Sequence, residues 1–137
     1  MRLPRRYLPT KENMKLWVDD IRTPPDDSWH IARSVSAAIR ALDMFWPEID
    51  EINLDHDISH QVVVGKISRP YPCEETFEAV ARYMVKIRQC SSLWLPKIQI
   101  HTSNYVGAKN MLDLLQGAGF QVEAKTVGGA NRLETIL

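Results

Sequence analysis

Cysteine is scarce in this chain, and net charge is absent. Cys73 and Cys90 are the two cysteines among 137 residues, and their spacing is not that of a metal-binding pair. We expect free thiols in a reducing compartment, which excludes a scaffold held together by disulfides. Seventeen basic side chains balance seventeen acidic ones, so no global field favours duplex DNA or an anionic membrane surface.

Long hydrophobic runs are also missing. No apolar stretch approaches the roughly 20 residues that span a bilayer, and the arginines near the amino terminus are not followed by the apolar core of a secretory signal. We therefore expect a cytoplasmic protein that does not contact membranes. Residues 1–13 combine arginine and proline without periodicity, which favours a flexible basic tail, and residues 14–137 are expected to form a single domain.

What the sequence does contain is an alternation of strand-like and helix-like segments. Strands are predicted at 15–18, 29–32, 49–54, 97–100 and 120–125, the last at a sheet edge. Helices are predicted after a cap at Ser34 or Ser36, from Glu74 or Glu75 to Arg88, and over 105–116. Because strands joined by crossover helices run parallel, we predict an α/β fold with a mainly parallel five-stranded sheet flanked by helices.

Two connections depart from this alternation. Pro24 and Pro25 follow the first strand and forbid a helix there, so the first strand-to-strand connection is predicted to be a proline-rich loop. Residues 58–72 form a long segment, and a loop of this length is commonly a functional lid or a disordered insertion. Its valine run at 62–64 favours a small extra strand, and Lys66 and Arg69 are interpreted as solvated loop charges.

Carboxylates follow two of the predicted strands. Asp19 and Asp20 come directly after the first strand, and Asp55 comes directly after the third. The carboxyl ends of parallel strands meet at one edge of a sheet, which is where open α/β sheets bind ligands. Carboxylates suit Mg²⁺ or Mn²⁺, so we predict a divalent metal site there. One such aspartate can also cap a turn through its own backbone, and the combination of three favours the metal.

Two histidines end different strands of the same predicted sheet. His56 lies beside Asp55, and His101 follows the fourth strand. Histidine gives or takes a proton near neutral pH, so we predict that His56, His101 and Asp55 are catalytic in phosphate ester cleavage. Arg22 and Asp57 are assigned supporting roles. Each histidine can alternatively be a hydrogen-bonded structural residue.

A polar run, Thr102-Ser103-Asn104, separates His101 from the last predicted helix. Ser103 or Asn104 can cap that helix, and the free N–H groups of a helix amino terminus form a ready anion site. We therefore predict that these three residues bind phosphate. Lys125 on the last strand is given no role.

The chain resembles the cyclic-phosphate processing receiver domain family in three motifs. They are LWVDDIRTP at 16–24, LDHD at 54–57 and IQIHTSNYVG at 98–107. The similarity runs from about Met14 to Phe120. It implies a modified response-regulator receiver with a flavodoxin-like sheet, in which Asp19 and Asp20 match the acidic metal-binding pair. It also places Asp55 where a receiver carries its phosphoacceptor aspartate.

The resemblance also indicates the chemistry. It implies that Thr102 or Ser103 is the hydroxyl residue that ends a receiver's fourth strand, and that the added His56 and His101 hydrolyse a phosphoester. We therefore expect a metal-assisted phosphoesterase whose partner is a phosphate-bearing small molecule or an RNA end, cleaved at a cyclic phosphate. Two alternatives stay open: a sensor module that binds a nucleotide or phosphate without cleavage, and a receiver domain with Asp55 as its phosphoacceptor.

Overall fold

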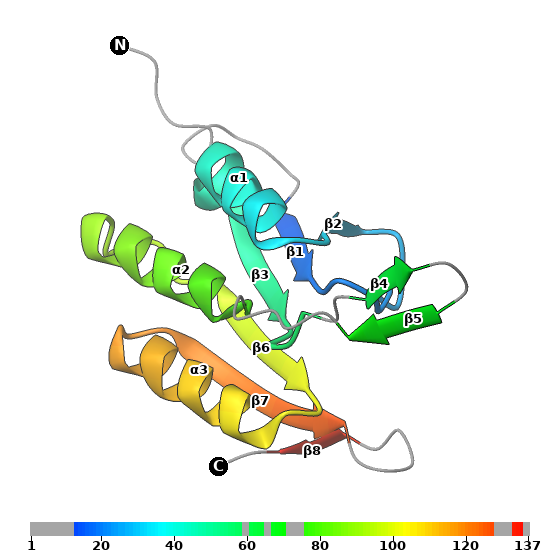
Figure 1. Ribbon diagram of the computed structural model, residues 1–137. Coiled ribbons are helices and arrows are strands. Elements are labelled where there is room, and N and C mark those ends of the chain that lie inside the picture. The colour runs from blue at the N-terminus through cyan, green and yellow to red at the C-terminus, as the bar shows by residue number, and fades with distance from the viewer. Residues whose placement is uncertain (1–12, 59–60, 65–66, 71–75, 128–132, 136–137) are drawn as a thin grey trace.

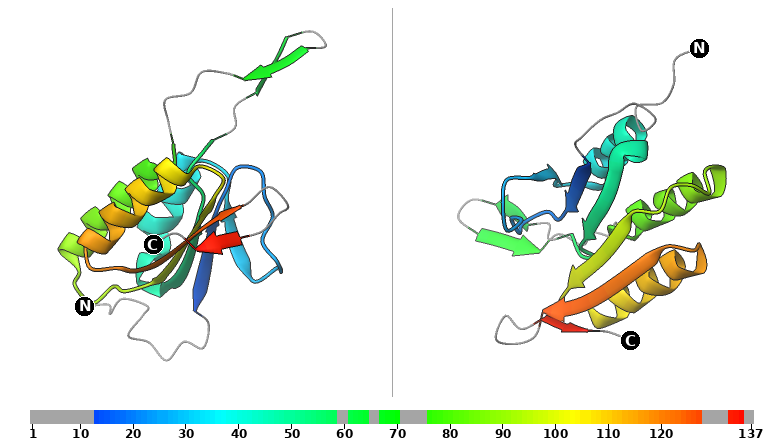
Figure 2. Two further views of the ribbon diagram at one scale, coloured as in Figure 1. Left: turned by 90° about the horizontal axis from the view of Figure 1, so that it is seen from below. Right: turned by 180° about the vertical axis from the view of Figure 1, so that it is seen from behind.

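The computed structural model describes residues 13–58, 61–64, 67–70, 76–127 and 133–135 (Figure 1). The strands of its main sheet are β1 (Met14–Val18), β2 (Trp29–Ala32), β3 (Ile49–Leu54), β6 (Lys97–Thr102), β7 (Gln121–Val127) and β8 (Leu133–Thr135). A separate hairpin consists of β4 (Gln61–Val64) and β5 (Ile67–Pro70), so the valine run does form a small extra strand. The hairpin lies apart from the main sheet (Figure 2).

The sheet has the strand order β2-β1-β3-β6-β7-β8. Its first five strands run parallel, and β8 pairs antiparallel with β7. Counted along the chain, the five parallel strands have the spatial order 2-1-3-4-5 of flavodoxin-like folds. The predicted receiver-like fold is therefore confirmed. It has one addition, because β8 pairs with the strand that we predicted at the edge.

The helices are α1 (Val35–Phe45), α2 (Glu78–Cys90) and α3 (Tyr105–Gly117), with a short 3-10 turn, η2 (Trp46–Glu48), after α1. Ser34 is the cap of α1 and accepts the backbone N–H of Ala37 at 3.1 Å. α2 begins later than predicted, and the Thr76 hydroxyl accepts the backbone N–H of Glu78 at its start. None of the helices in the described ranges is long and apolar enough to cross a membrane.

All three helices lie on one face of the sheet (Figure 2). The crossovers β2–α1–β3, β3–α2–β6 and β6–α3–β7 step in the same direction across the sheet, and right-handed crossovers in one direction place their helices on the same face. The connection from β1 to β2 steps the other way, and residues 19–28, which include both prolines, contain no helix. None of the described residues forms a helix on the opposite side of the sheet, which we call the helix-free face.

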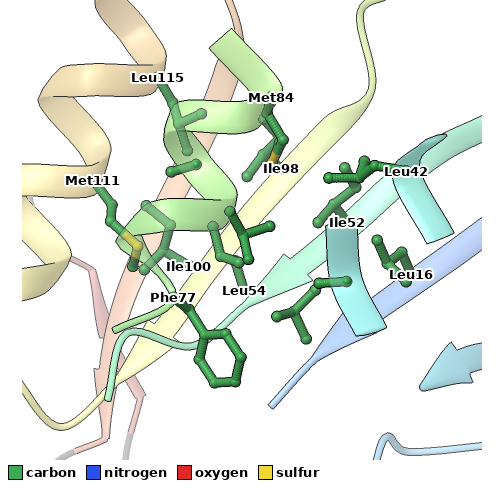
Figure 3. Packing of buried hydrophobic residues seen from close by; sticks show 14 of the residues in the cluster. Leu16, Leu42, Ile52, Leu54, Phe77, Met84, Ile98, Ile100, Met111 and Leu115 are labelled. Carbon is green, nitrogen blue, oxygen red and sulfur yellow. The ribbon is translucent and has the colours of Figure 1, made fainter. Parts of the chain in front are cut away.

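The hydrophobic core fills the space between the sheet and the helices (Figure 3). Fully buried strand residues pack there against residues of the helices and of the segment before α2: Leu16, Ile52, Leu54, Ile98 and Ile100 against Leu42, Phe77, Met84, Met111 and Leu115. Alternate strand residues point to opposite faces, so Trp17, Asn53 and His101 belong to the helix-free face. This packing aligns β1, β3 and β6 so that their carboxyl ends reach one edge (Figure 1).

Candidate functional site

A pocket of about 250 Å³ lies where the carboxyl ends of β1, β3 and β6 meet. Its lining comes from the segments at and after these strand ends: Asp19, Asp20, Ile21, Arg22, Asp55, Asp57, Thr102 and Ser103. Seven of these eight residues belong to the predicted site, and Ile21 is the addition. The other three predicted residues, His56, His101 and Asn104, do not line the pocket but contact residues that do.

The three carboxylates predicted to share an ion lie together. Asp19, Asp20 and Asp55 each offer a carboxylate oxygen, and these atoms all lie within 4.8 Å of one another. Asp19 is almost fully buried, and Asp55 is also buried. Hard carboxylate oxygens are the ligands that Mg²⁺ and Mn²⁺ prefer, so the chemistry and spacing of the three residues fit such an ion.

Asp19 also shapes the turn that follows β1. Its Oδ1 atom accepts the backbone N–H groups of Ile21 at 2.9 Å and Arg22 at 2.8 Å. The alternative role of a turn cap therefore applies to this aspartate, and it leaves the second oxygen, Oδ2, available for other contacts. Arg33 supports the same turn, since its guanidinium donates to the backbone oxygens of Asp19 and Arg22.

Burial gives the carboxylates different proton affinities. Burial raises the pKa of Asp55 to about 6, and the nearby negative charge of Asp19 adds to the shift. Burial would also raise the pKa of Asp19, but its hydrogen bonds from His101 and from the turn backbone outweigh that effect and lower it. Two neighbouring carboxylates with opposite shifts are typical of a functional site.

His101 contacts the carboxylate cluster directly. Its Nε2 atom lies 2.8 Å from Oδ2 of Asp19, and its Nδ1 atom is hydrogen-bonded to Oδ1 of Asn53. The ring is buried and packs against Trp17, with the ring centroids 4.8 Å apart. Because an amide oxygen can only accept, Nδ1 donates to Asn53, and one proton lies between Nε2 and Oδ2 of Asp19.

His56 lies on the other side of β3, against the starts of α2 and α3. Its Nδ1 atom bonds Oδ1 of Asp57 at 2.7 Å, and its Nε2 atom lies 3.6 Å from a carboxylate oxygen of Glu78. A Cβ atom on Gly107 would lie 2.5 Å from this ring, so α3 approaches it as closely as glycine allows. The His56 ring contacts the pocket lining at Asp57, and the backbone N–H of His56 donates to Asp55 at 2.7 Å.

The residues of the polar run at the end of β6 have different structural roles. Asn104 is the cap of α3, since its Oδ1 accepts the backbone N–H of Gly107 at 2.9 Å, and its Nδ2 donates to Asp57 at 3.0 Å. Thr102 is buried, and its hydroxyl accepts the backbone N–H of Asn104 at 3.1 Å. Ser103 is exposed and lines the pocket. The choice between Ser103 and Asn104 as the cap is therefore decided for Asn104.

Sequence reasoning missed three residues next to the site. Asn53, Glu78 and Gly107 touch the two histidines. A signal existed for Asn53, because asparagine is depleted in strands and here interrupts an apolar run.

Lys125 pairs with Glu123 at 3.2 Å, and no role was predicted for it. The predicted basic tail and Lys66 fall outside the residues that the structure describes, apart from Asn13 at the end of that tail.

Comparison with known proteins shows the family to which the chain belongs. Residues 14–117 match the family described as the cyclic-phosphate processing receiver domain, and this match covers well over half of the chain. No curated protein and no solved structure matches the chain. The matched region contains β1, β3 and β6 with every residue that lines the pocket. The chain is a member of the cyclic-phosphate processing receiver domain family.

Proposed function

We propose that this protein is a metal-assisted phosphoesterase that hydrolyses a cyclic phosphate carried by a nucleotide or an RNA end. The observation that carries the proposal is the approach of three carboxylates within 4.8 Å, with the His101 imidazole 2.8 Å from one of them. A receiver that stores a phosphoryl group needs the carboxylates but no histidine on them. The cyclic nature of the phosphate is taken from the family, whose description names it.

The carboxylates would hold the ion. Asp19, Asp20 and Asp55 supply three oxygen ligands, which suits Mg²⁺ or Mn²⁺. The bound ion would supply positive charge against the phosphate and act as a Lewis acid. Without such charge, a phosphate would meet the negative field of four aspartates in the pocket lining.

Donors in the pocket lining would hold the phosphate in place. The Arg22 guanidinium reaches within 4.0 Å of Asp19, and its Nη1 atom is shielded from solvent without a hydrogen-bond partner among the described residues. Ser103 is exposed and lines the pocket with its hydroxyl-bearing side chain, and Thr102 adds a second hydroxyl to the lining. Guanidinium and hydroxyl groups are common phosphate partners, so these three residues orient the phosphate.

Hydrolysis of a cyclic phosphodiester adds water oxygen to phosphorus, breaks one P–O ester bond and delivers a proton to the departing oxygen. His101 is the group best placed to move that proton, because its Nε2 atom lies 2.8 Å from a carboxylate of the cluster and shares a proton with it. His56 as the second acid–base group stays a prediction. Its ring reaches the pocket lining through its hydrogen bond with Asp57, and a proton would pass between the ring and the pocket through that carboxylate.

The pocket also limits how much of the substrate it encloses. At about 250 Å³ it is smaller than the roughly 300–1,000 Å³ of most small-molecule sites. It has room for the phosphate and its neighbouring ester atoms, and the remainder of a nucleotide would lie outside. Ile21 is 64% exposed on the pocket wall and offers an apolar contact to that remainder.

The test is turnover of a substrate panel by the purified protein. The panel contains 2′,3′-cyclic nucleotides, 3′,5′-cyclic nucleotides and RNA ending in a 2′,3′-cyclic phosphate, each with Mg²⁺ or Mn²⁺ and with a chelator. We expect cleavage that requires the ion and is lost in Asp20→Ala and in His101→Ala. Asp27→Ala is the matched control, because Asp27 is an exposed aspartate of the same connection outside the pocket. Absence of cleavage with every substrate would contradict the proposal.

One observation favours a second candidate function, a binding module without turnover. Both ring nitrogens of each histidine already face protein acceptors, and neither histidine lines the pocket. A binder would keep its ligand after loss of the histidine, whereas the enzyme would lose its rate. Thermal stabilisation of both wild type and His101→Ala by a panel member, without any product, would favour this candidate.

A further inference from the structure

Asn53 is a buried amide in the middle of β3, on the helix-free face. It is 6% exposed, and asparagine is unfavourable in strands. A buried polar group without a partner costs about 1–3 kcal/mol. Asn53 is therefore costly at this position unless its donor and its acceptor are both used.

Both ends of the Asn53 amide are used, and each end has a different partner. Nδ2 donates to Oε1 of Gln99 at 3.2 Å, and Oδ1 accepts from Nδ1 of His101. Asn53 and Gln99 are direct neighbours in the register of β3 and β6, and His101 follows Gln99 by two residues on the same face. Because Nδ2 can only donate, its bond to Gln99 leaves Oδ1 as the atom that faces the imidazole.

This contact decides which edge of the His101 ring faces the carboxylates. With Nδ1 held by Asn53, Nε2 points at Oδ2 of Asp19 at 2.8 Å. A half-turn of the ring would put carbon atoms against both oxygens and lose both hydrogen bonds. Trp17 packs on the ring at 4.8 Å between centroids and limits its tilt, but it does not distinguish the two orientations.

We infer that Asn53, with its amide oriented by Gln99, is a positioning residue that aims Nε2 of His101 at the carboxylate cluster. An effect of Asn53 on catalysis rests on the proposed phosphoesterase function, whereas the orientation of the His101 ring by Asn53 does not depend on that function. Removal of the hydrogen-bond partner behind a metal-ligating histidine commonly lowers metal affinity or activity by about 10- to 100-fold, and we expect an effect of similar size for a histidine that contacts a metal-ligating carboxylate.

The orientation is tested first, by long-range ¹H–¹⁵N NMR of the imidazole rings in the metal-free protein at neutral pH. His101 signals are identified by their loss in His101→Ala. We expect a protonated Nδ1 in the wild type and in Asn53→Asp, whose carboxylate keeps the acceptor while Gln99 can turn its own amide to donate. In Asn53→Leu that Nδ1 signature is lost. Wild-type His101 signals in Asn53→Leu would overturn the inference.

Kinetics supply the second readout, on whichever substrate the panel identifies. Asn53→Leu is expected to lower kcat by about 10- to 100-fold with little change in KM, and Asn53→Asp is expected to recover most of the rate. Glu51→Gln is the matched control, since Glu51 lies two residues before Asn53 on the same strand and the same face. Unchanged kcat in Asn53→Leu would overturn the role of Asn53 in catalysis, whereas the ring spectrum decides its role in orienting His101.

Failure of the proposed function and failure of a variant to fold are each distinguished from failure of the inference. If no substrate is cleaved, the proposed function fails, and the ring spectrum still decides the role of Asn53. If Asn53→Leu does not fold, Gln99→Leu replaces it, because it frees the Asn53 amide without changing Asn53. A mixture of His101 ring orientations in Gln99→Leu supports the inference, and a wild-type spectrum contradicts it.

Discussion

At the scale of single residues, Asp55 is a carboxylate that the fold buries with little to compensate its negative charge. It is buried beside Asp19, and only one backbone N–H, from His56, is hydrogen-bonded to its carboxylate among the contacts within the described residues. Its negative charge is therefore poorly compensated in the metal-free protein, which is why its pKa rises to about 6. An ion bound between the carboxylates would supply the missing compensation.

The first prediction concerns Asp55→Asn in metal-free buffer. A shift from 3.8 to about 6 corresponds to about 3 kcal/mol. The folded state holds the proton more tightly than the unfolded chain, so this contribution to stability is full below 3.8 and is lost as pH rises through about 6. The substituted side chain would carry no charge at any pH. We expect the variant to be more stable by about 2–3 kcal/mol at about pH 8, with the difference shrinking towards about pH 4.

Urea denaturation of both proteins across this pH range measures the difference. Asp19 and Asp57 have lowered pKa values, so their contributions to stability are lost as pH falls, and both residues are present in both proteins. A difference that stays constant with pH would show that Asp55 does not titrate in this range.

At the scale of elements, the contact between the start of α3 and the end of β3 holds the helix in place beside the pocket. Asn104 caps α3 and donates to Asp57, Asp57 accepts from His56, and the His56 ring fills the space over Gly107. The backbone oxygen of His56 also accepts the N–H of Phe77, just before α2. One histidine thus fixes the positions of two helix starts beside the pocket.

The second prediction tests this contact with Gly107→Ala. Alanine gains about 1 kcal/mol in helix propensity, but its Cβ would lie 2.5 Å from a buried ring that is tied to Asp57. Overpacking of this kind costs about 1–3 kcal/mol, so a net destabilisation of up to about 2 kcal/mol is expected. Gly117→Ala is the matched control in the same helix, because no atom lies within 4 Å of its added Cβ. It should be neutral or more stable by up to about 1 kcal/mol. Equal unfolding free energies for both variants would contradict the packing described.

Elements were predictable from the sequence where a pattern is local. The strand 49–54 follows from periodicity and agrees with the structure, and side-chain chemistry limited the cap of α1 to Ser34 or Ser36, of which the structure has Ser34. The three carboxylates were predicted to meet because parallel strands bring their ends together. The role of Asn53 was not predictable in this way, since its contacts depend on the register between β3 and β6, which no local pattern determines.

The start of α2 and the strand β8 were missed for a related reason. The Thr76 hydroxyl accepts the first backbone N–H of the helix, and the acidic residues that precede it in the sequence suit a helix start equally well. β8 is three residues long and is formed only by pairing with β7. Short segments of this kind have too few residues to show a period of two.

At the scale of the whole molecule, the direction of the crossovers leaves one side of the parallel sheet without helices among the described residues. Parallel sheets are usually covered on both faces. Here the helix-free face carries Trp17, Asn53 and His101, and the β1–β2 connection folds back so that the Trp17 indole N–H donates to the backbone oxygen of Arg22 at 3.0 Å. The groups that orient His101 therefore lie on the opposite side of the sheet from the hydrophobic core. Few side chains that pack in the core also belong to the site.

The carboxylate cluster is the exception, and it links the stability of the whole molecule to ion binding. An ion that binds the folded state alone stabilises it by about 2.7 kcal/mol at 100 times its dissociation constant. Protons compete with the ion for Asp55, whose pKa is about 6. The third prediction is therefore that Mg²⁺ raises the thermal midpoint, and that the rise is larger at about pH 8 than at about pH 5 because the folded-state carboxylate is then ionised.

Thermal unfolding with and without Mg²⁺ at both pH values measures this link, with NaCl at equal ionic strength to account for screening. Asp20→Asn removes one ligand charge from the cluster and should respond to Mg²⁺ as it does to NaCl. Asp27→Asn removes an exposed charge outside the pocket and should keep the full response. If the Mg²⁺ effect were the same at both pH values, Asp55 would not be one of the ligands. If Asp20→Asn kept the full effect, the ion would bind elsewhere on the molecule.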